Sequence, residues 1–316
     1  METDIRCGSD PEWALAAEQC HAERFACPAP PCPYDNCSQL IPADKSLPEF
    51  FAFRSHSQEE STMVPGFRKR LHAGETLLGT MLTLPSASVA EILADAGFDW
   101  LFVDCEHGAM DAAAVQQIVQ AVGDRCACIV RIPILNEGDI KRMLDVGAQG
   151  IIVPAVNTPE AAADTVRFSR YAPEGERGAG IGRAQRYGKA FAEYTASANE
   201  EVVVIVQAEH RKAVDNIDAI TAVPGIDCIL LGPYDLSASF GLMGQIDDPQ
   251  VLEAIDRVIA NCQQKSLPVG YFGVTSEVVL EHARKGCTLL IAGVDVTFLS
   301  AGATRMRGRM LPTEQE

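Results

Sequence analysis

The chain has 316 residues, of which 47% are hydrophobic and 22% charged, and its net charge at pH 7 is −17. A negative charge of this size repels phosphate backbones and anionic membranes, so we expect neither nucleic acid nor a membrane as a partner. No apolar run approaches the roughly 18 residues of a membrane helix. The acidic N-terminus has no apolar segment typical of a signal peptide, so we expect a cytoplasmic protein.

Residues 1–62 differ from the rest of the chain because they are rich in proline, cysteine, serine and acidic residues. Cys27, Cys32 and Cys37 follow a C-x4-C-x4-C pattern, which lacks the C-x2-C pair typical of a structural zinc site. We therefore expect a flexible extension without a packed core, although a zinc site is the alternative. We expect residues 63–316 to form a single folded domain. Most cysteines beyond residue 62 lie in apolar patterns, which predicts buried thiols without disulfides in a reducing compartment.

From Met63 onward, eight apolar runs of strand length alternate with helical patterns. The runs cover residues 77–82, 100–104, 127–131, 150–153, 202–207, 227–231, 268–272 and 288–292. Between them, Val115, Ile118, Val119 and Val122 follow the spacing of one helix face. Strands that are apolar on both faces and alternate with helices indicate a parallel sheet covered by helices. Eight repeats favour closure, so the prediction is a (β/α)8 TIM barrel, an α/β fold.

One segment interrupts the alternation. Residues 170–199 are longer than one helix with two short loops, and they include Gly178 and Gly180. We interpret the segment as a mobile loop over the barrel mouth, from which Arg183 and Arg186 reach an anion. Solvated arginines without a ligand are the alternative interpretation.

Two acidic residues follow neighbouring strands. Glu209 comes after the fifth apolar run and Asp235 after the sixth. In a parallel barrel the carboxyl ends of adjacent strands meet at the face that carries the chemistry, so both carboxylates are expected to share one cation. Two carboxylates with water and substrate oxygens suit Mg2+ or Mn2+, and Co2+ is a further candidate. An ion pair and a helix cap are the alternative roles.

Further candidate catalytic residues follow the second and third runs. His107 lies three residues after Asp104, so a hydrogen bond from the imidazole to that carboxylate would leave the other ring nitrogen basic. Arg131 ends the third run, where a guanidinium can stabilise a carboxylate or an enolate. A surface histidine and a salt bridge from Arg131 to Glu106 are the alternatives.

A tight turn follows the sixth run. Gly232 and Pro233 start this turn, and the backbone N–H groups of Tyr234 and Asp235 are expected to point into the mouth. Such a cluster of N–H groups binds a substrate carboxylate.

Taken together, six stretches of the chain resemble the HpcH/HpaI aldolase family, the class II pyruvate-dependent aldolases. They are DWLFVDCEH (99–107), VRIP (130–133), DVGAQG (145–150), RYAPEGERG (170–178), VQAE (206–209) and GPYDLS (232–237). The similarity extends over residues 63–311.

The resemblance implies a divalent metal held by Glu209 and Asp235, a base formed by His107 with Asp104, and contact of Arg131 with pyruvate or its enolate. It also places Gln207 and Glu106 either in the site itself or in contact with the residues that form it. It further implies a homo-oligomer, often a hexamer, in which the last helix, here residues 295–309, is exchanged between neighbours.

The chain departs from the family pattern in three places. Residues 1–62 have no counterpart, Tyr234 stands where many relatives have a small residue, and Phe272 ends the seventh run with a large side chain. Phe272 is expected at the aldehyde end of the substrate site.

The predicted activity is metal-dependent cleavage of a 4-hydroxy-2-oxo acid to pyruvate and an aldehyde. The lysines after residue 62 fall in helical or loop patterns rather than at strand ends, which argues against a Schiff-base mechanism. Oxaloacetate decarboxylation, cleavage of an acyl-CoA of the malyl or citramalyl type, and a barrel that binds without catalysing remain as alternatives.

Overall fold

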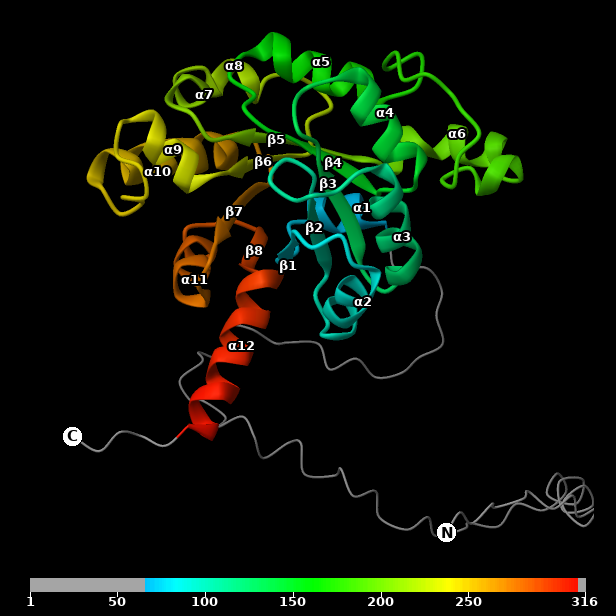
Figure 1. Cartoon of the computed structure of the whole chain (residues 1–316). Coiled ribbons are helices and arrows are strands. Elements are labelled where there is room, and N and C mark those ends of the chain that lie inside the picture. The colour runs from blue at the N-terminus through cyan, green and yellow to red at the C-terminus, as the bar shows by residue number, and fades with distance from the viewer. Residues whose placement is uncertain (1–65, 312–316) are drawn as a thin grey trace, which may run out of the picture. The chain divides into compact units, whose positions relative to one another are not determined.

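The computed structural model describes residues 66–311, and their central feature is a closed barrel of eight parallel strands in sequence order (Figure 1). The strands are β1 (Leu77–Leu82), β2 (Trp100–Asp104), β3 (Ala127–Arg131), β4 (Gly150–Val153), β5 (Val203–Ala208), β6 (Cys228–Leu231), β7 (Val269–Gly273) and β8 (Leu289–Val294). Each begins and ends within two residues of its expected position. The predicted (β/α)8 TIM barrel is confirmed, whereas the predicted extension, residues 1–62, lies outside the described residues.

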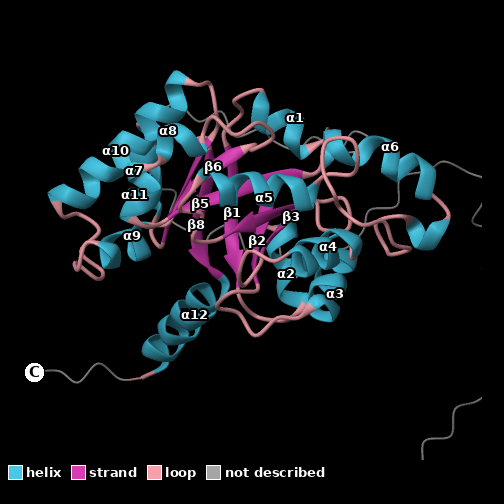
Figure 2. Cartoon of the chain, turned by 90° about the horizontal axis from the view of Figure 1, so that it is seen from above, coloured by secondary structure: helices cyan, strands magenta, loops and turns pink. Residues whose placement is uncertain are grey.

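Helices surround the strands, as Figure 2 shows from above. They are α1 (Phe67–His72), α2 (Ala87–Asp95), α3 (Ala112–Val122), α4 (Glu137–Asp145), α5 (Pro159–Ser169), α6 (Phe191–Glu201), α7 (Arg211–Asp215), α8 (Ile217–Ile220), α9 (Pro233–Ser239), α10 (Pro249–Gln264), α11 (Ser276–Arg284) and α12 (Asp295–Met310), with a 3-10 turn at Arg186–Gly188. Side chains of Thr158 and Asp248 cap α5 and α10, each with proline in the first turn. Within residues 66–311, no helix is long and apolar enough to cross a membrane.

The buried apolar residues form two layers because side chains alternate along each strand. On β2, Trp100 and Phe102 belong to a cluster of strand residues inside the barrel, while Leu101 and Val103 pack with the surrounding helices. The six cysteines from Cys105 onward are all buried and free, as the sequence predicted.

Helix α1 closes the N-terminal end of the barrel. Its Phe67 joins the interior cluster and packs against Trp100. The buried carboxylate of Asp227, just before β6, accepts hydrogen bonds from Arg68 Nε at 2.7 Å and from Arg170 Nη2 at 3.1 Å. His72 Nε2 lies 2.7 Å from the same carboxylate. This buried ionic cluster ties α1 to the barrel at the end opposite the carboxyl ends of the strands.

The segment from residue 170 to β5 does not cover the barrel mouth, so that prediction was wrong. Arg170 donates from Nη1 to the carbonyl oxygen of Val202 at 2.6 Å, and Ala184 N donates to the carbonyl oxygen of Asp145 at the end of α4 at 3.0 Å. The topology explains this position, because each helix of a βα unit returns the chain to the N-terminal face before the next strand starts. Arg183 and Arg186 lie on this segment and are therefore remote from the mouth.

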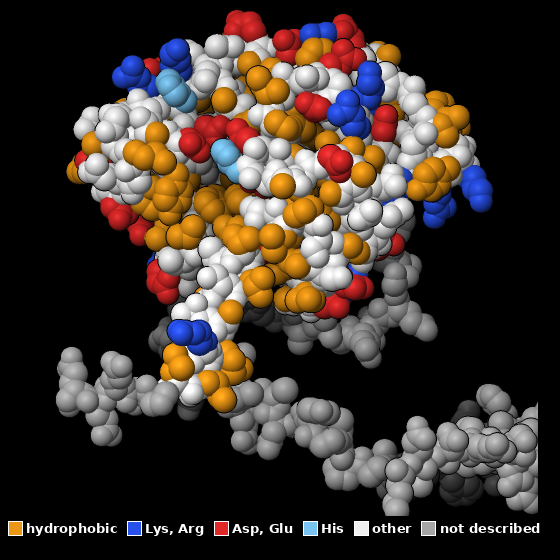
Figure 3. All heavy atoms as spheres, viewed as in Figure 1, with side chains coloured by type: hydrophobic (Ala, Val, Ile, Leu, Met, Phe, Trp, Pro, Cys, Tyr) orange, Lys and Arg blue, Asp and Glu red, His pale blue; other side chains and the backbone are white. Residues whose placement is uncertain are grey.

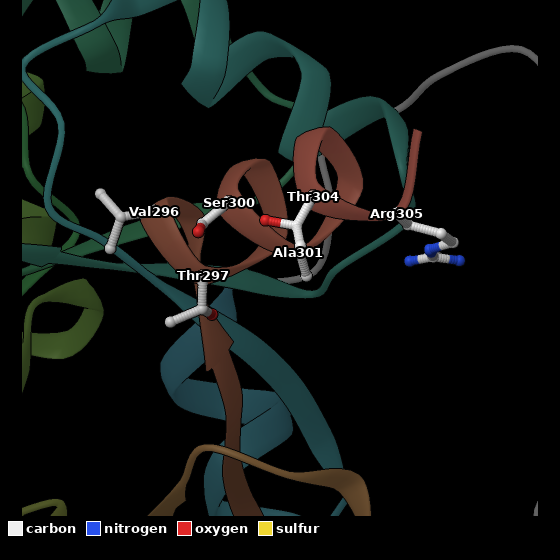
Figure 4. A pocket seen from close by; sticks show the side chains of 6 residues that line it. All are labelled: Val296, Thr297, Ser300, Ala301, Thr304 and Arg305. Carbon is white, nitrogen blue, oxygen red and sulfur yellow. The ribbon is translucent and has the colours of Figure 1, made fainter. Parts of the chain in front are cut away.

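Helix α12 projects from the end of β8 away from the barrel (Figure 1). The buried Asp295 fixes its start, because this carboxylate accepts hydrogen bonds from Thr83 N at 3.1 Å and Leu84 N at 2.8 Å. Beyond Asp295 every described residue of α12 is exposed, and hydrophobic side chains are visible on its free end (Figure 3). The face of α12 labelled in Figure 4 borders a shallow depression that is open to solvent.

Candidate active site

The predicted site residues follow strands that are neighbours in the barrel. Asp104 at the end of β2 is in register with Arg131 at the end of β3. Ala208 of β5 is in register with Leu231 of β6, so Glu209 and Gly232 follow at adjacent positions. The closed barrel therefore brings these groups to the carboxyl ends of the strands, where barrel enzymes carry their chemistry.

Asp104 and Arg131 form a buried, two-pronged ion pair. Arg131 donates from Nε to Asp104 Oδ1 at 2.9 Å and from Nη2 to Oδ2 at 2.8 Å. Burial alone would raise the pKa of Asp104, but the hydrogen bonds and charge of Arg131 lower it below its usual value. Asp104 is therefore a carboxylate at neutral pH, and the salt bridge that was an alternative role for Arg131 is present.

His107 does not place its imidazole on Asp104, so that predicted contact was wrong. Its backbone N–H donates to Asp104 Oδ1 at 3.3 Å, while its side chain is 66% exposed. The reason is that Arg131 engages both carboxylate oxygens of Asp104. The loop carrying His107 is nevertheless tightly fixed, since a Cβ at Gly108 would lie 2.2 Å from the carbonyl oxygen of Asp104.

Glu106 lies between the arginine and the histidine. Its Oε2 is 3.1 Å from Arg131 Nη1 and 3.8 Å from His107 Nε2. The same oxygen is buried and makes no hydrogen bond. Burial raises the pKa of Glu106 despite the opposing charge of Arg131. Beside the readily ionised Asp104, the mouth thus contains a carboxyl group, Glu106, that ionises less readily than usual.

Glu209 is a buried carboxyl group, 7% exposed, with one satisfied oxygen and one unsatisfied oxygen. Oε1 accepts a hydrogen bond from Ala155 N at 2.7 Å, whereas Oε2 is buried without a partner. Burial is the main cause that raises the pKa of Glu209 to about 7, and the nearby Asp235 adds to it. Ala155 has a φ of 52°, a left-handed conformation that is unfavourable for a residue with a side chain. The backbone is thus strained where it holds this carboxylate.

The oxygens around Glu209 fit a hard divalent cation. The buried Oε1 of Gln207 has no hydrogen-bond partner either, and Asp235 lies exposed in the first turn of α9. A Cβ at Gly232 would lie 2.8 Å from Gln207 Nε2 and 3.0 Å from Glu209 Oε2, so a larger residue there would displace these two side-chain ends. Unsatisfied carboxylate and amide oxygens are ligands that Mg2+ and Mn2+ accept. Within residues 66–311 no three His, Cys, Asp or Glu side chains form a metal-holding group, so water and substrate would have to complete the coordination.

Two aromatic side chains extend the site from β6 to β7. The rings of Tyr234, in the first turn of α9, and Phe272, on β7, have centroids 6.3 Å apart and are tilted by 56°. The two rings form an apolar surface next to the polar groups of the adjacent strands. Such a combination suits a substrate with one charged and one uncharged end.

Sequence reasoning missed three contributors to the site. Ala155 acts through its backbone N–H, Phe102 lies under the Arg131 guanidinium at 5.0 Å, and Gly108 allows the close approach of the loop. Nothing in the residue types signals the left-handed Ala155. The alternation along β2 does place Phe102 inside the barrel beside Asp104, so that contact was accessible from the pattern.

Comparison with known proteins gives consistent matches. The family model described as HpcH/HpaI aldolase/citrate lyase matches residues 78–301. A 4-hydroxy-2-oxovalerate aldolase of Novosphingobium aromaticivorans is 38% identical over 77% of this chain and 93% of its own length. A hydroxypyruvate/pyruvate aldolase of Roseobacter denitrificans is 36% identical over 74% and 92%. The crystal structure of an HpcH/HpaI aldolase/citrate lyase family protein from Burkholderia cenocepacia, 36% identical, superposes with a TM-score of 0.74 and covers 77% of this chain and 97% of that one.

Proposed function

The chain belongs to the HpcH/HpaI aldolase/citrate lyase family and is an aldolase, and from this premise we propose how its own residues act. The reaction is cleavage of the C3–C4 bond of a 4-hydroxy-2-oxo acid, which yields pyruvate and an aldehyde. Relatives named for 4-hydroxy-2-oxovalerate, hydroxypyruvate/pyruvate and 5-keto-4-deoxy-D-glucarate support this substrate class.

A divalent cation, Mg2+ or Mn2+ by the chemistry of the donors, would be held by Glu209 and Asp235. The observation that carries this assignment is the unsatisfied, buried Oε2 of Glu209. When bound, the cation would supply positive charge that stabilises a developing enolate. Its charge also opposes the burial that raises the pKa of Glu209, so the carboxylate form is favoured in the loaded protein.

Arg131 and His107 would act on the substrate directly. The guanidinium of Arg131 retains N–H groups beyond those that Asp104 engages, and these stabilise the enolate oxygen that forms when the C3–C4 bond breaks. His107, exposed on the loop after β2, takes the proton from the C4 hydroxyl. The enolate is then protonated at C3 to give pyruvate, and His107 gives up the proton it had taken, which restores the base. No Schiff base is required, since every lysine within residues 66–311 lies on a helix or in a loop.

The substrate ends would be distinguished by different surfaces. The first N–H groups of α9, on Tyr234 and Asp235, have no helical acceptor and are placed to hold the carboxylate. Gly232, at the start of this turn, lies against the side chains of Gln207 and Glu209. Phe272, with the ring of Tyr234, would contact the aldehyde end.

A homo-oligomer, in which α12 packs on a neighbouring copy, accounts for the exposed helix. Leu299, Met306 and Met310 are 65%, 63% and 78% exposed, which is unfavourable for apolar side chains that stay in water. We expect wild type to elute as an oligomer, a hexamer by the family resemblance, and Leu299→Asp to shift it to smaller species in light scattering. A monomeric wild type would contradict this proposal.

The activity is tested by pyruvate release from a panel of 4-hydroxy-2-oxo acids and oxaloacetate, each with Mg2+, Mn2+, Co2+ or EDTA. We expect EDTA-sensitive release from the hydroxy-oxo acids and its loss in Glu209→Gln. Glu277→Gln is the matched control, because Glu277 is an exposed residue in the first turn of α11. Release from oxaloacetate alone would indicate a decarboxylase. No release from any of them would contradict the proposal and direct attention to acyl-CoA substrates or to a non-catalytic barrel.

A further inference from the structure

The carboxylate of Asp104 accepts four hydrogen bonds, and none of them comes from the His107 imidazole. Besides the two hydrogen bonds from Arg131, its Oδ1 accepts backbone N–H groups from Glu106 at 3.0 Å and from His107 at 3.3 Å. With Asp104 1% exposed, water is not available to replace these partners. Oδ2 accepts from Arg131 alone, and neither oxygen takes a hydrogen bond from the imidazole of His107.

The guanidinium of Arg131 is held on several sides. Asp104 binds Nε and Nη2, Glu106 Oε2 lies 3.1 Å from Nη1, and the ring of Phe102 lies under the group at 5.0 Å. The residue is 4% exposed. A guanidinium has five N–H donors in a rigid plane, so fixing one edge with a carboxylate aims the remaining donors as well.

We propose that Asp104 is a positioning residue for Arg131 and not the partner of the His107 imidazole. This inference rests on the proposed function, in which the Arg131 guanidinium donates hydrogen bonds to the enolate oxygen. The carboxylate fixes the plane of the guanidinium, and Glu106 and Phe102 restrict it from the other sides. Positioning of this kind accelerates a reaction because donors already aimed at the developing charge need no reorganisation.

The binding of oxalate to Mn2+-loaded protein tests the role of Asp104 without turnover, because oxalate is a planar dianion shaped like pyruvate enolate. We expect Arg131→Met to weaken oxalate binding about 100-fold, through loss of a charge-assisted donor pair, and Asp104→Asn to weaken it about tenfold. The double variant should bind no more weakly than Arg131→Met, because Asp104 acts only through the arginine. Asp111→Asn is the matched control, since Asp111 caps α3 in the same loop and asparagine retains that function.

The pH dependence of cleavage distinguishes positioning from partnership with the base. If Asp104 serves Arg131, Asp104→Asn lowers kcat but leaves the acidic side of the pH–rate profile at its wild-type position. The inference would be overturned if Asp104→Asn bound oxalate as tightly as wild type, or if the losses of oxalate affinity in the two single variants added up in the double variant. A shift of the acidic side of the pH–rate profile in Asp104→Asn would also overturn it.

Failure of the proposed function would look different. Wild type would then fail to bind oxalate at all, and a double-mutant cycle on urea unfolding would still test whether the Asp104 and Arg131 side chains are coupled. Absence of coupling in that cycle would overturn the inference independently of any ligand. Circular dichroism of each variant would confirm that the barrel is folded before these comparisons are made.

Discussion

Removing the charge of Glu209 is expected to stabilise the metal-free protein while abolishing its response to metal. The folded-state pKa of this buried carboxyl is about 7, against an ordinary value of 4.5. Between these values the folded protein binds more protons than the unfolded chain does. Its stability therefore falls as the pH rises through this window, and the full penalty applies above pH 7.

The size of the penalty follows from that interval. At about 1.4 kcal/mol for each pH unit, ionising Glu209 in the folded protein costs about 3 kcal/mol. Glutamine has nearly the same shape, and its Oε1 can still accept the hydrogen bond from Ala155 N. For a barrel of this size, 1 kcal/mol corresponds to about 2–4 °C in Tm, so Glu209→Gln should raise Tm at pH 8 in EDTA by about 6–12 °C.

Thermal unfolding of wild type and Glu209→Gln in EDTA from pH 5 to pH 8.5 measures this effect. The two Tm values should converge near pH 5, where the wild-type carboxyl is protonated, and separate above pH 7. Addition of Mn2+ at pH 8 should raise the Tm of wild type alone. A Glu209→Gln protein that is less stable than wild type at pH 8, or a difference that does not vary with pH, would refute the reasoning.

Three further substitutions test other parts of the account. Gly108→Ala should lower kcat at least tenfold, because its Cβ would lie 2.2 Å from the carbonyl oxygen of Asp104 and would displace the loop that carries His107. Unchanged kinetics would contradict this. Asp227→Asn should cost about 3 kcal/mol in urea unfolding at pH 7. Burial raises the pKa of Asp227, but its cationic partners lower it below 3.8, so the wild-type advantage should vanish as the pH falls through that lowered value. Phe272→Ala should raise the ratio of kcat/KM for bulky aldehydes to kcat/KM for small aldehydes about tenfold. An unchanged ratio would show that Phe272 does not contact the aldehyde end of the substrate.

The periodicity of the chain was sufficient to predict the barrel. The local sequence is enough to recognise a strand that is apolar on both faces, such as β5, or an amphipathic helix, such as α3. Eight repeats of such strand and helix patterns favour closure of the sheet into a barrel. The position of residues 170–199 was mispredicted because glycines and arginines were given more weight than topology. A segment between a helix and the next strand must lie at the N-terminal face.

The convergence of the candidate residues at one end of the barrel was predictable, but the contacts among them were not. Glu209, Asp235 and Arg131 follow strand ends, so their convergence followed from the fold. Which group meets Asp104 depends on competition between the nearby His107 and the more distant Arg131, and the guanidinium offers two aligned hydrogen bonds where the imidazole offers one. The left-handed Ala155 has no sequence signal at all, because its conformation is imposed by packing around it.

The most direct test of the account is a titration of metal-stripped protein with Mn2+ that follows bound metal and pyruvate release from a 4-hydroxy-2-oxo acid in the same samples. The account predicts that pyruvate release rises in proportion to the metal bound, reaches a plateau at one ion per chain, and is absent in Glu209→Gln. Full release from metal-stripped protein, or undiminished metal binding by Glu209→Gln, would contradict it.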